Sequence, residues 1–108
     1  MRIMLLASSL CFGLVLLVPA ARADAIDGNW CRDVGLRITI NGPSIVTPAG
    51  TRTQGEYSRH AFSYVIPPGD PDAGATMFMR LLGEEAMQSR LGAQGPIEDW
   101  RRCGPPVS

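Results

Sequence analysis

The chain has 108 residues, among them 10 Arg, no Lys, 10 acidic residues, one His and three Cys, and its formal net charge is zero. This length allows one small domain and excludes several domains or a large cofactor-binding fold. Nucleic acid is disfavoured as a partner because the only adjacent arginines are Arg101 and Arg102. A phosphate-binding surface needs several cations along one face.

The first 23 residues have the pattern of a secretory signal peptide. Arg2 gives a positive start, residues 3–18 form an apolar stretch, and Ala21 and Ala23 supply the small side chains that a signal peptidase accepts. An uncleaved membrane anchor is the alternative, since the apolar stretch approaches the ~20 residues needed to span a bilayer.

Cleavage before Asp24 would leave one mature domain, residues 24–108, without a stable membrane anchor. Arg2 and Arg22 would be lost, so the mature protein would hold 8 Arg against 10 acidic residues, a formal charge of −2. We therefore expect a periplasmic or secreted protein.

Two cysteines, Cys31 and Cys103, remain in the mature chain. An even pair in an oxidising compartment predicts one disulfide, here joining the two ends of the domain and worth ~4 kcal/mol on the chain-entropy model. A redox-active pair is usually spaced as Cys-x-x-Cys. A metal site would have only these two thiols and His60, with no paired spacing. We expect neither a metal nor a cofactor.

Short segments separated by turn residues predict an all-β domain of about eight antiparallel strands. The expected strands begin at Gly28 and then cover residues 36–41, 44–47, 52–57, 60–66, 75–82, 86–91 and 97–103. The segment 84–91 also contains good helix formers, so two helical turns remain an alternative there.

Alternation of apolar and polar residues indicates which side chains face the core. Phe62, Tyr64 and Ile66 share one face, whereas an unbroken strand would place Tyr57 on the other, so we expect a tight turn or bulge near residues 58–59. In segment 75–82, Met77, Met79 and Leu81 share one face and Phe78 and Leu82 the other, which predicts a strand covered at least partly on both sides.

Eight such strands are best accommodated in an up-and-down barrel, because closure removes the exposed edges. With Cys31 placed directly opposite Cys103 on the first and last strands, Trp30 would face Gly104 and Arg32 would face Arg102. Trp30, Trp100 and Arg102 would then point inward, and Arg102 would stack on the Trp30 indole.

The Gly-x-Trp sequence at Gly28 and Trp30, together with Arg102 in the last strand, resembles the calycin group of small barrels: lipocalins, avidin-like proteins and bacterial metalloprotease inhibitors of similar shape. The chain also looks like small exported proteins of Gram-negative bacteria that begin with Gly-x-Trp-Cys and end with Trp-Arg-x-Cys. The resemblance implies a barrel closed by Gly28, Trp30 and Arg102, and it implies no particular function.

Three functions follow as hypotheses. The first is a non-enzymatic binding or inhibitor-like module that holds an envelope protein or an incoming hydrolase through loop 67–74, with Asp70 and Asp72. The second is a carrier of one small apolar molecule in the barrel mouth, lined by Phe62, Tyr64, Met77 and Met79. The third is a hydrolase using His60, for which no catalytic spacing is present.

Overall fold

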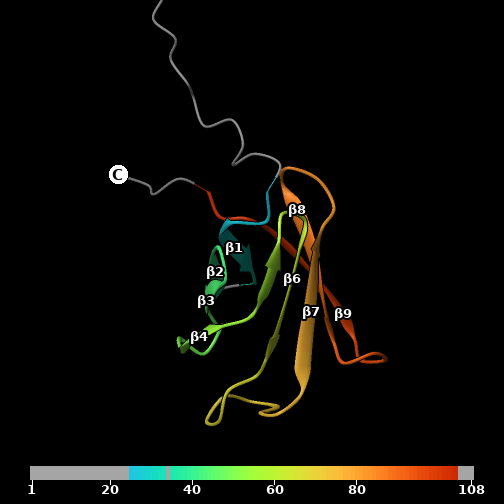
Figure 1. Cartoon of the computed structure of the whole chain (residues 1–108). Helices are drawn as coiled ribbons and strands as arrows, with labels where there is room; N and C mark the ends of the chain where they lie inside the picture. Colours follow the sequence, from blue (N-terminus) through green and yellow to red (C-terminus); the bar gives the residue numbers. More distant parts are fainter. Residues whose placement is uncertain (1–24, 34, 105–108) are drawn as a thin grey trace, which may run out of the picture.

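A computed structural model describes residues 25–33 and 35–104, so the predicted signal peptide lies outside the described residues. The regular structure of this part consists of strands (Figure 1). They are β1 (Gly28–Arg32), β2 (Leu36–Asn41), β3 (Ser44–Val46), β4 (Arg52–Gln54), β5 (Glu56–Ser58), β6 (Ala61–Val65), β7 (Thr76–Leu81), β8 (Ala86–Leu91) and β9 (Ile97–Arg102). Within the described residues there is no helix of a length and hydropathy that would cross a membrane.

The strands form one antiparallel sheet in the order β4-β3-β2-β1-β9-β8-β7-β6-β5, which curls into a nearly closed barrel (Figure 1). The predicted all-β fold is therefore confirmed. Each predicted segment contains a strand, and the fourth contains two, β4 and β5. Residues 86–91 form a strand, so the helical alternative for this region is excluded.

The barrel is closed through Gly55, which lies between β4 and β5. β4 pairs with β3, β5 pairs with β6, and the Gly55 amide donates to the Pro43 carbonyl at 2.9 Å. A Cβ atom at Gly55 would lie 2.2 Å from the Ser63 carbonyl oxygen and 2.7 Å from Cε1 of Phe62. The chain thus passes at Gly55 from pairing with β3 to pairing with β6. The absence of a side chain lets Gly55 approach β6 closely.

Tight turns occur where the sequence predicts them. Gly42 and Pro43 connect β2 to β3, with Gly42 at φ 59°. Residues 59 and 60 connect β5 to β6, so that Tyr57 pairs with Phe62. The turn explains why Tyr57 and Phe62 differ in parity, because directly paired residues on the two strands face the same side of the sheet.

Side chains fill the interior of the barrel. The buried cluster contains two Trp, an aromatic pair from β6, two Met and several Ile: Ile26, Trp30, Ile38, Ile40, Ile45, Phe62, Tyr64, Ile66, Met79, Met87 and Trp100. The outer side of β7 is not covered in the same way, because Phe78 is 47% and Leu82 48% exposed. The strand is therefore half-buried, with its methionines inside.

Arg102 closes one end of the barrel. Its guanidinium donates from Nη2 to the Ala25 carbonyl at 2.8 Å, from Nη1 to the Asp27 carbonyl at 2.6 Å and from Nε to the Glu84 carbonyl at 2.7 Å. The predicted stacking contact is present, with the guanidinium carbon 4.1 Å from the centroid of the Trp30 ring. One side chain therefore joins the start of the domain, the β7–β8 turn and β1.

The segment before β1 passes across this closed end. Ile26 is fully buried, its amide donates to the Arg59 carbonyl at 2.8 Å, and its carbonyl accepts from Trp30 Nε1 at 2.9 Å. A Cβ atom at Gly28, which has φ 125°, would lie 2.5 Å from Nη1 of Arg102. Only glycine fits between the strand and the guanidinium.

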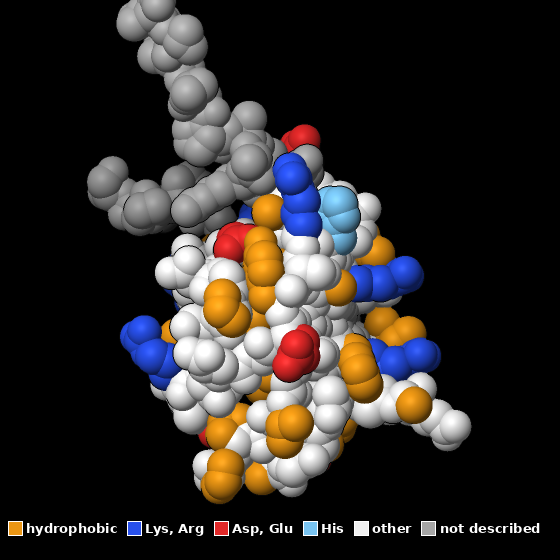
Figure 2. Space-filling model, viewed as in Figure 1, with side chains coloured by type: hydrophobic (Ala, Val, Ile, Leu, Met, Phe, Trp, Pro, Cys, Tyr) orange, Lys and Arg blue, Asp and Glu red, His pale blue; other side chains and the backbone are white. Residues whose placement is uncertain are grey.

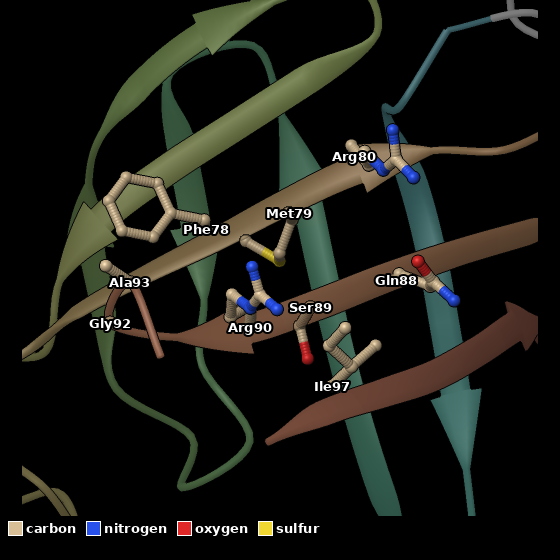
Figure 3. A pocket seen from close by; sticks show the side chains of 9 residues that line it. All are labelled: Phe78, Met79, Arg80, Gln88, Ser89, Arg90, Gly92, Ala93 and Ile97. Atoms are coloured by element: carbon tan, nitrogen blue, oxygen red, sulfur yellow. The ribbon is translucent and has the colours of Figure 1, made fainter. Parts of the chain in front are cut away.

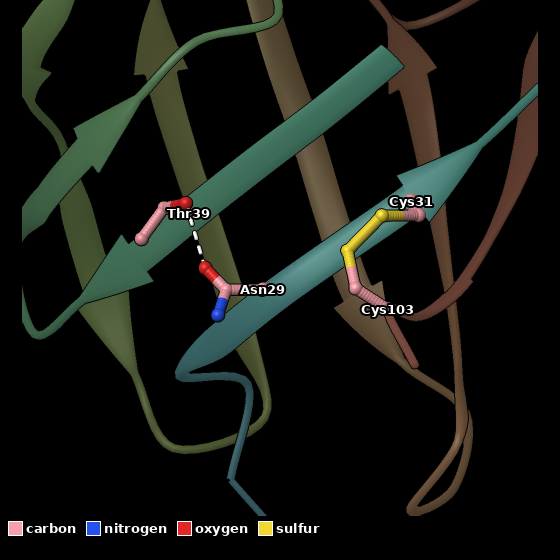
Figure 4. Close-up of a disulfide and its surroundings, with 4 residues drawn as sticks. All are labelled: Asn29, Cys31, Thr39 and Cys103. Atoms are coloured by element: carbon pink, nitrogen blue, oxygen red, sulfur yellow. Dashed lines mark hydrogen bonds between the residues drawn. A yellow bond between two sulfur atoms is a disulfide. The ribbon is translucent and has the colours of Figure 1, made fainter. Parts of the chain in front are cut away.

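A disulfide joins Cys31 to Cys103, as predicted, with the Cα atoms 5.0 Å apart (Figure 4). Cys31 pairs in the ladder with Arg101, so the bridge runs diagonally to a cysteine that follows the end of β9. On the same face, Thr39 Oγ1 donates to the side-chain oxygen of Asn29 at 2.8 Å. The bridge thus lies on the outside of the barrel wall.

The predicted register between β1 and β9 is wrong by two residues. Trp30 pairs with Arg102 rather than with Gly104, and Arg32 lies over the Trp100 ring instead of facing Arg102. Because the shift is even, every side chain keeps the face that the sequence predicts. The error comes from placing the two cysteines directly opposite each other.

We predict that Arg102→Lys lowers the free energy of unfolding by about 2–4 kcal/mol. A lysine ammonium lacks the planar fork that reaches three carbonyls, and each hydrogen bond to a charged donor is worth about 1.5–3 kcal/mol. Chemical denaturation with the disulfide intact measures the change. Arg101→Lys is the matched control, since Arg101 is exposed on the same strand; equal losses in the two variants would contradict the role of Arg102.

Gly55→Ala should also destabilise the fold, by about 1–3 kcal/mol, because the new methyl group overlaps the Ser63 carbonyl oxygen and the side chains of Phe62 and Tyr64 on β6. Gly83→Ala is the control, since a Cβ there meets nothing within 4 Å. Thermal unfolding of both variants against the natural protein tests the prediction. A Gly55 variant as stable as the Gly83 variant would show that the barrel does not close through this contact.

Candidate binding site at the open end of the barrel

The end opposite Arg102 is formed by the loops that follow β1, β3, β6 and β8 (Figure 1). Its longest loop, residues 67–74, is anchored by Asp70. The Asp70 carboxylate accepts hydrogen bonds from Thr47 Oγ1 at 2.7 Å and Thr51 Oγ1 at 2.6 Å, both in the β3–β4 loop. Since Thr47 is only 2% exposed, this carboxylate also satisfies a buried hydroxyl. The two loops are held together as one unit.

Backbone hydrogen bonds shape the remainder of the β6–β7 loop. The Gly74 amide donates to the Ile66 carbonyl at 2.9 Å, and the Ala75 amide donates to the Asp72 carbonyl at 3.1 Å. Asp72 adopts φ 66° and is exposed. Together with three prolines, these bonds give the loop one preferred shape and reduce the entropy that binding would cost.

A cavity of about 280 Å³ lies between this loop and the ends of β2, β6 and β7. Its apolar lining includes Leu36, Tyr64, Ile66 and Met77, and the exposed Asp72 also borders it. The cavity therefore combines an apolar interior with a charged margin.

Tyr64 contributes a buried hydroxyl to the wall of this cavity. The side chain is 4% exposed, and its hydroxyl has no hydrogen-bond partner among the residues that the structure describes. Burial, and to a smaller extent the charge of Asp70, raises the pKa of Tyr64 to about 12. Buried tyrosine hydroxyls normally have a partner. Water or a bound molecule in the cavity can supply one.

The β1–β9 side of the open end is polar. Arg32 and Glu98 form an ion pair, and the Arg32 guanidinium carbon lies 5.5 Å from the centroid of the Trp100 ring. Trp100 Nε1 donates to the hydroxyl of buried Ser89 at 3.0 Å. The ion pair covers the second tryptophan, so the cavity on the β6–β7 side is the apolar part of this end.

The structure divides the four residues predicted to line a barrel mouth. Tyr64 and Met77 border the cavity. Phe62 and Met79, each 2% exposed, lie in the filled core. Strand parity predicts that all four side chains face the interior. It does not predict how far each lies from the open end of the barrel.

The predicted surface and catalytic candidates lie apart. Asp70 and Asp72 are both in the β6–β7 loop, where Asp70 serves as an anchor and Asp72 is exposed. His60 is exposed in the turn between β5 and β6, so it lies at the other end of β6 from Asp70. No group of three metal-ligating side chains occurs within residues 25–33 and 35–104.

Sequence reasoning missed the residues that hold this end together. Thr47 and Thr51 precede and follow a Pro-Ala-Gly turn, which gives no sign of a contact with Asp70 about 20 residues later. Arg32 and Glu98 could have been found, because each lies two residues from an inward-facing tryptophan and shares its parity.

Comparison of the chain with protein-family models, with curated proteins and with solved structures finds no match. The function therefore has to be argued from the geometry of the site.

Stability at high pH should report the environment of Tyr64. Because its pKa rises from 10.0 when unfolded to about 12 when folded, its contribution to stability is complete below pH 10 and is lost as the pH rises towards 12. Denaturation midpoints across this range should fall less steeply in Tyr64→Phe than in the natural protein. Parallel pH profiles would show that the hydroxyl is not buried.

Proposed function

We propose that the protein is an exported, non-enzymatic binding module of the cell envelope, periplasmic or secreted, that holds a protein partner at its open end. The observation that carries this proposal is the β6–β7 loop, which Asp70 fastens to Thr47 and Thr51 beside an apolar cavity. A preformed rim of this kind binds with little loss of conformational entropy. An inhibitor-like role, in which the partner is an incoming hydrolase, is one form of the same proposal.

The size of the cavity favours one side chain of a larger partner. Pockets that enclose drug-sized molecules measure about 300–1,000 Å³, and this cavity has about 280 Å³. It cannot extend into the barrel, because Phe62, Met79 and Trp100 occupy the space below. A protein partner gains its remaining contact area from the exposed loops around the cavity.

A second candidate, the carrier of one small apolar molecule, is favoured by the Tyr64 hydroxyl. A compact molecule with one hydrogen-bonding group would fill the cavity and supply the missing partner. The two candidates predict bound partners of different mass: a protein for the first and a small molecule for the second.

Ala49→Trp is expected to abolish capture of the protein partner, because Ala49 borders the cavity and an indole there would fill it. His60→Trp adds the same group to the β5–β6 turn at the opposite end of the barrel, where His60 is exposed, and should leave capture unchanged. The test is capture from the host's own envelope extract by each immobilised protein. Substitutions of Asp70 are unsuitable, since they would also release the loop.

The result is informative in each direction. A protein retained by the natural chain and by His60→Trp but lost from Ala49→Trp supports the proposal, provided the unfolding midpoints agree. Capture that survives Ala49→Trp contradicts the assignment to the open end. A small added mass in a non-denaturing mass spectrum, lost in Ala49→Trp, would replace the protein partner with the second candidate.

A further inference from the structure

The outer face of β7, β8 and β9 combines exposed apolar side chains with arginines. Phe78 on β7 pairs with Arg90 on β8, and Arg90 pairs with Ile97 on β9, so the three form one row across the sheet. Phe78 is 47% and Ile97 51% exposed. Figure 2 shows arginine side chains next to hydrophobic ones along one margin of the molecule. Apolar and cationic side chains are therefore accessible side by side on this face.

This row forms one wall of a groove of about 440 Å³ (Figure 3). The opposite wall is the next outward-facing pair, Arg80 and Gln88. Between the two walls, the pair formed by Met79 and Ser89 directs its side chains into the core, so only backbone lines the floor. The groove is therefore a consequence of strand alternation, with long side chains on both sides of a bare strip.

Each wall carries a guanidinium that is not neutralised. Neither Arg80 nor Arg90 forms an ion pair or a side-chain hydrogen bond with any residue in the part of the chain that the structure describes. Asp99 continues the row of Arg80 and Gln88 on β9 and accepts a hydrogen bond from Gln88 Nε2 at 3.1 Å, so this face carries one carboxylate beside the two guanidiniums. Two cations thus face one groove in a chain whose formal net charge is zero.

We propose that this groove is a docking site for an acidic segment of a partner protein, in which carboxylates lie between Arg80 and Arg90 and apolar side chains pack on Phe78 and Ile97. Carboxylates match the planar, forked donors of arginine, and Phe78 and Ile97, exposed beside Arg90, offer contact to apolar side chains of the same segment. The groove is concave, which suits an inserted chain segment better than the flat surface of a bilayer.

This groove shares no lining residue with the cavity at the open end, although it reaches Gly92 and Ala93 in the β8–β9 loop. Its side chains point out of the barrel wall, whereas Tyr64 and Met77 face the interior. The proposal therefore does not depend on the proposed function, and each can fail without the other.

The experiment is a titration of the exported, ¹⁵N-labelled protein, disulfide intact, with the synthetic peptide acetyl-Glu-Phe-Glu-Leu-Glu-amide, followed by amide chemical shifts. We expect shifts at residues 78–80, 88–90 and 97. Affinity should fall by about tenfold or more in Arg80→Gln/Arg90→Gln and for the peptide in which every Glu is Gln. Arg37→Gln/Arg52→Gln removes the same charge from exposed positions on β2 and β4, so it should bind like the natural protein.

Several results would overturn the proposal. They are the absence of shifts, equal weakening in both double variants, equal binding of the Gln peptide, and shifts confined to the open end. Vesicles of phosphatidylglycerol provide a further test. If they bind the protein and the peptide does not, and if Arg80→Gln/Arg90→Gln abolishes this binding, the surface contacts membrane instead of an acidic chain. Ala49→Trp should leave peptide binding intact, which separates this site from the open end.

Discussion

The fold depends on the guanidinium of Arg102. Three backbone carbonyls from two distant segments share this single cation, and its flat face rests on Trp30. Carbonyls at the end of a barrel would otherwise need water. Arg102 adds to the bonds that Ile26 makes with Arg59 and Trp30 in holding the residues before β1 across the opening. With these residues in place, Ile26 is fully buried as a plug. The contacts of Arg102 at the closed end therefore serve stability, whereas the candidate cavity lies at the other end of the barrel.

The two tryptophans of β1 and β9 are arranged reciprocally. Trp30 lies under Arg102 of the opposite strand, and Trp100 lies under Arg32 of the first strand. Both strands carry the spacing Trp-x-Arg, so an antiparallel pairing that joins one Trp to the opposing Arg also joins the other. This register could have been predicted from the sequence, because it is the register in which each tryptophan stacks on an arginine of the opposite strand. Placing the cysteines opposite each other concealed it, since a disulfide can also run diagonally when one cysteine follows the end of its strand.

Strand order, strand faces and the disulfide could be predicted because they depend on local alternation and on the number of cysteines. The split of the fourth strand could not, since Gly55 looks like any turn glycine until β6 is seen beside it. The candidate site was predictable in part. Parity placed Tyr64 and Met77 inside, but the bond from Asp70 to Thr47 joins two loops whose spacing has no periodicity. The sequence shows that β7 is rich in apolar residues. That Phe78 remains half exposed depends on how the whole sheet is arranged.

Strand β7 connects the two candidate binding surfaces. Phe78 points outward to the groove, and the preceding residue, Met77, borders the cavity at the open end. Adjacent residues of a strand face opposite sides, so a partner on one surface could affect the other only by moving this backbone. β6 and β8 pair with β7 on its two sides and hold it in place. The barrel thus favours independent binding at the two proposed surfaces.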